Sequence, residues 1–197
     1  MKRMLLVLLT AGSATFASAQ VEFGVKAGVN IANLTVTGDN SGVSPSSITD
    51  FHAGFLAAIP LFSGFKLQPE VMYSGQGASA DVSGTTVKLN YSYINVPVLF
   101  KYQHGSGLFA ETGPQVGFLI SAKEKADGQT IDTKSDTQST DFSWAFGIGY
   151  KIPVVGLGID ARYNLGLTNL AKGSNSSDET VKNSVIQIGL FYVMKGM

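Results

Sequence analysis

Residues 21–31 alternate strictly between apolar side chains and polar or small ones. One side of this extended segment carries Val21, Phe23, Val25, Ala27, Val29 and Ile31, and Glu22, Gly24, Lys26, Gly28 and Asn30 lie between them. A period of two is typical of a β-strand with two different faces. Seven further segments repeat the pattern, over about 51–61, 65–74, 89–102, 108–121, 141–152, 157–167 and 184–194. The pattern predicts an all-β protein of eight antiparallel strands.

The segments between these strands alternate between long and short. The long ones are polar and rich in Ser, Thr, Asn, Asp and Gly, and they cover 32–50, 75–88, 122–140 and 168–183. The short ones carry turn residues, as Ser63-Gly64 does. An outer-membrane barrel has short periplasmic turns at one rim and longer extracellular loops at the other. We therefore predict an eight-stranded antiparallel up-and-down transmembrane β-barrel with four long extracellular loops, and with both chain ends on the short-turn side.

The two faces of the strands differ in side-chain size. In one strand the large residues Phe142, Trp144, Phe146, Ile148, Tyr150 and Ile152 alternate with Ser143, Ala145, Gly147, Gly149 and Lys151. An interior eight strands wide is just filled by side chains and has no room for a full ring of such large residues. We therefore expect the large residues to face lipid. A soluble lipocalin-like barrel, with large residues inside a wider cup and an apolar ligand, is the alternative fold.

Aromatic residues gather near both ends of the strands. We expect them to form two girdles at the headgroup levels. Toward the long loops lie Phe51, Tyr73, Tyr91, Tyr93, Phe142 and Trp144, and toward the short turns lie Phe62, Phe65, Tyr102, Phe109, Tyr150 and Tyr192.

Charged residues within the strands mostly share the face opposite the large apolar residues. A charge facing hydrocarbon is costly, whereas a charge inside the barrel can pair with an opposite charge from another strand. The candidate lumen charge network consists of Lys26, Lys66, Glu70, Lys101, Glu111, Asp160 and Arg162. These residues could plug a narrow lumen with salt bridges or line a path for solutes. The expected width favours the plug.

The N-terminal residues have the three parts of a secretory signal peptide. Lys2 and Arg3 form a basic start, residues 4–9 are apolar, and Ala17-Ser18-Ala19 is a cleavage sequence of small residues. We expect 1–19 to be a signal peptide and 20–197 to be the barrel domain. The 197 residues carry 14 Lys and Arg and 14 Asp and Glu, so loss of two cations leaves a net charge of −2. This balance is unfavourable for nucleic-acid binding.

The sequence offers no set of residues for catalysis or metal binding. The absence of Cys excludes disulfides and thiolate zinc sites, and no G-x-S-x-G motif is present. The strand pattern places His52 and His104 at opposite rims, where they could not share a metal ion. We therefore expect no catalytic residue, no cofactor and no metal.

Six motifs together resemble the outer-membrane "porin family" barrels of Gram-negative bacteria, including the PorT-like group. They are residues 23–30 (FGVKAGVN), 67–74 (LQPEVMYS), 94–102 (INVPVLFKY), 111–114 (ETGP), 147–150 (GIGY) and 160–167 (DARYNLGL). The resemblance implies an eight-stranded barrel in the outer membrane, with no catalytic residues and no common substrate. It also makes Pro69, Pro97 and Pro114 family features. We expect bulges or strand ends at these prolines, because proline cannot donate to a β-ladder.

These patterns predict a structural or surface-interaction barrel with a plugged lumen. Its expected partners are outer-membrane lipid and an extracellular ligand bound through the loops 32–50, 75–88, 122–140 and 168–183, and we expect a monomer. A narrow channel for ions or small solutes is the alternative. A membrane-embedded lipid-modifying enzyme is a third hypothesis, for which His52 near the outer rim is the sole candidate group.

Overall fold

The computed structural model describes residues 21–37, 45–82, 85–126, 128–170 and 180–194. The strands are β1 (Glu22–Thr37), β2 (Ser46–Phe62), β3 (Phe65–Val82), β4 (Thr85–Gln103), β5 (Leu108–Ala126), β6 (Gln129–Asp132), β7 (Thr140–Lys151), β8 (Leu157–Gly166) and β9 (Thr180–Met194). A short 3-10 helix, η3 (Lys134–Asp136), follows β6. The predicted signal peptide, 1–19, lies outside the described residues.

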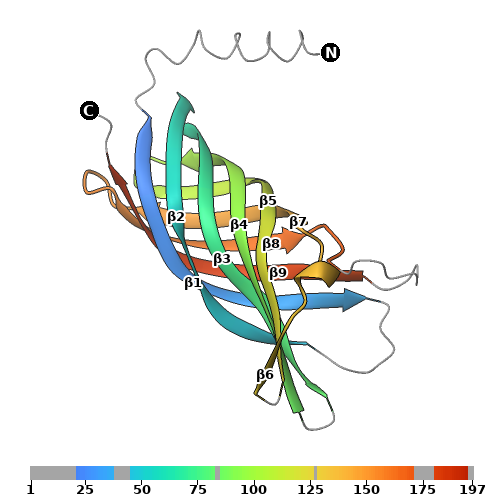
Figure 1. The fold of residues 1–197 in the computed structure, drawn as a ribbon. Helices are drawn as coiled ribbons and strands as arrows, with labels where there is room; N and C mark the ends of the chain where they lie inside the picture. Colours follow the sequence, from blue (N-terminus) through green and yellow to red (C-terminus); the bar gives the residue numbers. More distant parts are fainter. Residues whose placement is uncertain (1–20, 38–44, 83–84, 127, 171–179, 195–197) are drawn as a thin grey trace, which may run out of the picture.

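Eight of these strands close into a ring. Each strand pairs antiparallel with its neighbour in the order β1, β2, β3, β4, β5, β7, β8 and β9, and β6 pairs with β5 at one end. The ring is closed by β1 and β9, which pair from Phe23 with Met194 to Thr37 with Thr180 (Figure 1). The predicted eight-stranded antiparallel barrel is confirmed. Among the described residues, no helix is long and apolar enough to span a membrane.

Short turns collect at one end of the ring. Residues 63–64 join β2 to β3, and both have positive φ angles, with Gly64 at 85°. Glycine adopts such angles without steric cost, so the strands reverse within two residues. The start of β1 and the end of β9 lie at this end, and β6 lies at the other (Figure 1). We call these the short-turn end and the distal end.

The outer face of the ring carries the large apolar side chains. Phe55 is 69% exposed and Ile148 is 68% exposed, whereas the inward-facing Ala145 is 1% exposed. Polar atoms on the outer face bond to one another: Trp144 Nε1 donates to Thr112 Oγ1 over 2.8 Å, and this hydroxyl donates to the Ala145 carbonyl over 3.0 Å. An apolar band with satisfied polar groups suits hydrocarbon, where water cannot replace a missing hydrogen bond.

The strands extend further at the distal end than the sequence predicted. Most of the expected loop 75–88 is strand, because β3 continues to Val82 and β4 starts at Thr85. The expected loop 122–140 contains the end of β5, β6 and η3. The expected loops 32–50 and 168–183 lose residues to β1, β2 and β9, and 38–44 and 171–179 lie outside the described residues. Those four loop bounds are wrong, and the loops are shorter.

The loop bounds are wrong because the alternating pattern of apolar and polar residues is inverted above the apolar band. In this part of β4, Lys88 faces outward and is exposed, and Tyr91 and Tyr93 face inward and are buried. Polar residues therefore face water and apolar residues fill the inside, as in a soluble barrel. The expected girdle positions of Tyr91 and Tyr93 are wrong for the same reason. That of Phe109, at the short-turn end, is also wrong, because its side chain lies inside the ring.

The three strand prolines do not interrupt the register. Pro69 pairs with Val98, Pro97 with Gln115 and Pro114 with Trp144, and no register shift occurs at these pairs. The expected bulges there are wrong. Only alternate residues of an antiparallel strand bond to a given neighbour, so a proline can occupy the ladder without an extra residue opposite it.

Candidate functional site

Six of the seven predicted network residues meet in the middle of the lumen. We call this group the central network, and it consists of Lys26 on β1, Glu70 on β3, Lys101 on β4, Glu111 on β5, and Asp160 and Arg162 on β8. Each of these six residues is less than 5% exposed. Three cations face three carboxylates, so the formal charge of the central network is zero.

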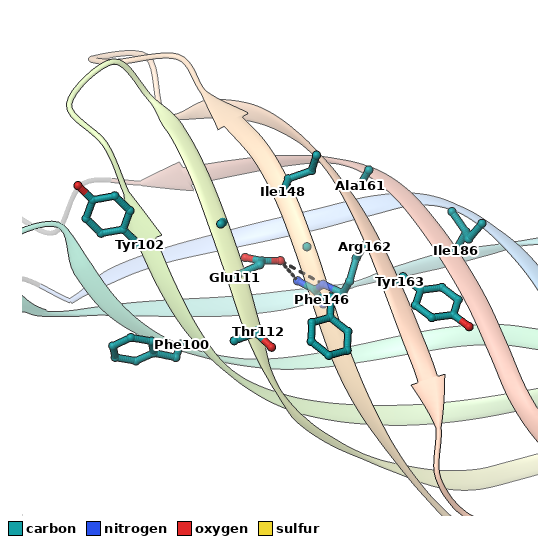
Figure 2. A pocket seen from close by; sticks show the side chains of 12 residues that line it. Phe100, Tyr102, Glu111, Thr112, Phe146, Ile148, Ala161, Arg162, Tyr163 and Ile186 are labelled. Atoms are coloured by element: carbon teal, nitrogen blue, oxygen red, sulfur yellow. Dashed lines mark hydrogen bonds and ion pairs between the residues drawn. The ribbon is translucent and has the colours of Figure 1, made fainter.

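Arg162 is the centre of this network. Its Nη1 and Nη2 donate to the two carboxylate oxygens of Glu70, each over 2.8 Å. Its Nε and Nη2 donate to Glu111 Oε1 over 3.1 and 2.6 Å, as the dashed lines in Figure 2 show. A planar guanidinium with several fixed donors can hold two carboxylates at once. In the ring order β3 and β8 are opposite each other, so the Arg162–Glu70 bonds cross the full width of the lumen.

Gln68 and Lys101 extend the network toward the short-turn end. Lys101 Nζ donates to Gln68 Oε1 over 3.0 Å and lies 3.6 Å from Glu111 Oε2. Gln68 Nε2 donates in turn to Glu70 Oε1 over 2.7 Å. Lys101 Nζ also lies 3.5 Å from the centre of the Phe109 ring, a cation–π contact. Each polar group here therefore has a protein partner in place of water.

Lys26 and His52 occupy the other side of the network. Lys26 Nζ forms an ion pair with Asp160 Oδ2. His52 is 1% exposed, and its Nδ1 bonds to Asn30 Oδ1 over 2.7 Å. Asn30 also donates to Ser74 Oγ over 2.9 Å. The expectation that His52 lies at the outer rim is wrong, because β2 continues past it to Ser46 and its side chain is buried in the lumen at the level of Asp160.

Lys66 is the predicted residue that does not join the central network. Its Nζ lies 2.8 Å from Glu22 Oε2, and the same oxygen lies 3.2 Å from Lys151 Nζ. These three residues are at the start of β1, the start of β3 and the end of β7, so this ion cluster is at the short-turn end. Sequence reasoning left Glu22 and Lys151 out of the network. It also missed Gln68, although Gln68 shares its face of β3 with Glu70 at a spacing of two.

Buried apolar clusters lie in the lumen on both sides of the central network. Toward the short-turn end, Leu56, Phe109, Phe191 and Val193 form a buried cluster that we call the floor. Toward the distal end lies a second cluster that we call the lid, made of Leu34, Ala78, Tyr91, Tyr93, Leu119, Ala122 and Leu170. Leu170 follows β8 and reaches the lid from outside the strands. The floor residues come from β2, β5 and β9, and the lid residues come from β1, β3, β4, β5 and the segment after β8.

The described side chains of the site pair with one another through the ion pairs and hydrogen bonds given above. His52 contacts an amide, not a nucleophile that it could activate, and it lies inside the barrel, away from lipid. In the part of the chain that the structure describes, no three His, Cys, Asp or Glu side chains are grouped to hold a metal ion. The geometry can fill the lumen and fasten opposite walls together.

The outer face near the network has an open apolar groove (Figure 2). The small residues Ala110 and Ala161 lie between the larger Tyr102, Ile148 and Tyr163 in its lining. Glu111 and Arg162 belong to the wall behind it and point inward, as their burial shows.

Comparison with known proteins gives a family and a fold. The family model described as "Outer membrane protein beta-barrel domain" matches residues 13–172. Among solved structures, the Neisserial surface protein A (NspA) is 14% identical, with a TM-score of 0.54, 86% of this chain and 96% of that chain covered. Ail from Yersinia pestis is 16% identical, with a TM-score of 0.49 and coverage of 89% and 99%.

OprG from Pseudomonas aeruginosa is 12% identical, with a TM-score of 0.49 and coverage of 90% and 97%. No curated protein matches the sequence. At 14% identity, the likeness to NspA shows the fold alone.

Proposed function

Because the chain belongs to the outer membrane protein beta-barrel domain family, and so lies in the outer membrane of a Gram-negative bacterium, we propose that it is a structural and surface-interaction barrel with a closed lumen. It spans the membrane with eight strands. The distal end is then the extracellular end, and the short turns face the periplasm. In this proposal the rigid barrel acts as a monomer that presents its extracellular end to a ligand or partner.

The observation that carries the proposal is the bridge from Arg162 to Glu70 across the width of the lumen. An ion passing through the barrel must break a bidentate charge-assisted pair between opposite walls, one of the stronger side-chain contacts in proteins. It must also displace the buried rings of Phe109 in the floor and Tyr93 in the lid. Three successive closed layers support a plug and disfavour a pore.

Planar-bilayer recording tests the proposal. The folded protein, checked by its faster gel migration before heating, is expected to give no discrete current steps, because each layer of the lumen is filled. A known porin inserted under the same conditions serves as the positive control.

Reproducible unitary currents from the wild-type barrel would overturn the closed lumen and support the narrow-channel alternative. The Arg162→Gln variant would then assign the current to this lumen if its ion selectivity changed. The absence of current steps from the folded barrel, under conditions in which the control porin conducts, supports the plug.

Two narrower predictions accompany this proposal. Membership of the PorT-like group stays a prediction from motifs such as residues 94–102 and 160–167. Removal of residues 1–19 as a signal peptide also stays a prediction.

A further inference from the structure

Four exposed lysines gather on the outer face of the barrel wall near the extracellular end. Lys88 is on β4, Lys123 and Lys125 are on β5, and Lys134 is in η3. Lys88 and Lys125 are direct partners in the β4–β5 register. Like charges opposite each other destabilise a sheet, so this arrangement has a cost that an external anion would remove. We call these four residues the lysine patch.

The lysine patch forms no ion pair with a carboxylate in the described part of the chain. None of the ion pairs formed there includes any of the four lysines. Asp132 is the register partner of Lys123, but its Oδ1 accepts the backbone N–H of Lys134 over 2.9 Å. Glu124, the other nearby acid, is half-buried. The ammonium groups of Lys88, Lys123 and Lys125 are therefore available to an external partner.

The lysine patch lies directly above the apolar band. On β5, Phe118 and Ile120 are the last large apolar residues of the outer face, 48% and 45% exposed. Lys134 Nζ donates to the Ile120 carbonyl over 3.1 Å, so this ammonium is at the edge of the band. Lys123 is three residues further, a rise of about 7 Å for a strand tilted by about 40°. That is the level of the lipid headgroups.

The patch is confined to one side of the barrel. Among the described residues at the extracellular ends of the other ring strands, Lys182 on β9 is the one further cation. A cationic cluster at headgroup level attracts anionic lipid headgroups. A partner there must carry its negative charge at the membrane surface, on the same molecule as the acyl chains that cover the apolar band.

We propose that the lysine patch binds the phosphate groups of the phosphorylated glycolipid in the outer leaflet, lipopolysaccharide. The acyl chains of the bound glycolipid lie against the apolar face of β4 and β5, and its phosphates lie between Lys88, Lys123 and Lys125. The site orients the barrel's lipid shell on one side. It does not depend on whether the lumen conducts.

Binding of fluorescent lipopolysaccharide to the folded barrel in phosphatidylcholine nanodiscs tests the site. We expect the K88Q/K123Q/K125Q variant to bind about 100-fold more weakly, because each cation near an anionic headgroup contributes about fivefold. The matched control K182Q is expected to bind like the wild type, and K88R/K123R/K125R is expected to retain binding. Lys134 stays unchanged in these variants because its side chain supports the Ile120 carbonyl.

Two further binding measurements identify the source of the negative charge. Chemically dephosphorylated glycolipid is expected to lose binding to the same extent as the triple variant, and inorganic phosphate alone is expected to compete poorly. Equal binding by K88Q/K123Q/K125Q and the wild type would overturn the proposal. Retained binding of the dephosphorylated glycolipid, or full competition by inorganic phosphate, would also overturn it.

Discussion

The Arg162→Ala barrel is expected to unfold with a free energy about 3–5 kcal/mol lower than the wild type, the usual cost of removing one partner from a buried ion pair. Arg162 donates to both oxygens of Glu70 and to Glu111 Oε1. Its loss leaves two carboxylates that are 2% and 4% exposed facing each other without a cation between them. Urea-dependent unfolding of the barrel in lipid vesicles measures the difference.

Two variants separate lost charge from lost packing. Arg162→Lys keeps the charge but lacks the planar fork that holds two carboxylates, so we expect an intermediate loss. The triple variant R162A/E70Q/E111Q removes the unpaired charges and is expected to recover part of the stability of R162A. A loss below about 1 kcal/mol for R162A would mean that the network does not hold the walls together.

The Ile148→Lys variant is expected to destabilise the barrel in lipid by about 2–4 kcal/mol, the cost of a lysine at the bilayer midplane. Ile148 is 68% exposed and lies near the middle of the apolar positions of β7. The matched control is Ile131→Lys, because Ile131 is 60% exposed on β6, beyond the apolar band. We expect this control to change stability by no more than about 0.5 kcal/mol.

The same unfolding assay compares the two variants in one lipid. A large cost for Ile148 and none for Ile131 places hydrocarbon against β7 and the region beyond the hydrocarbon against β6. Equal effects at both positions would contradict the lipid-facing assignment of the outer apolar band.

The face of each membrane-spanning strand could be predicted from the sequence because side-chain parity has only two states. Phe146 and Ile148 could not fit inside a ring of eight strands, so Gly147 and Lys151 had to face inward. The same parity places Glu70, Glu111 and Arg162 in the lumen without any knowledge of register. The strand number follows from the count of alternating segments, and the side of the chain ends follows from the alternation of long and short connections.

Which inward residues meet could not be predicted, because parity gives no height along the barrel. The stagger of the strands brings Arg162 level with Glu70 and Glu111, and it leaves Lys66 lower, beside Glu22. The extension of the strands beyond the apolar band could not be predicted for a different reason. A hydrophobic pattern indicates a lipid-facing strand only within the membrane, and Tyr91 and Tyr93 lie where the outside is water and the inside is apolar.

Nuclear Overhauser contacts from methyl groups, measured for the barrel in lipid nanodiscs, test the central claim most directly without altering a side chain. We expect Ile148, Ile159 and Ile188, which are 68%, 50% and 43% exposed, to show contacts to lipid acyl chains. Leu56, Leu99 and Val185, which are 4%, 0% and 1% exposed, are expected to show none to lipid or to mobile water. Water contacts at the inward methyl groups would contradict a closed barrel. Lipid contacts at the inward methyl groups and none at the outward ones would contradict a barrel that faces lipid with its large side chains.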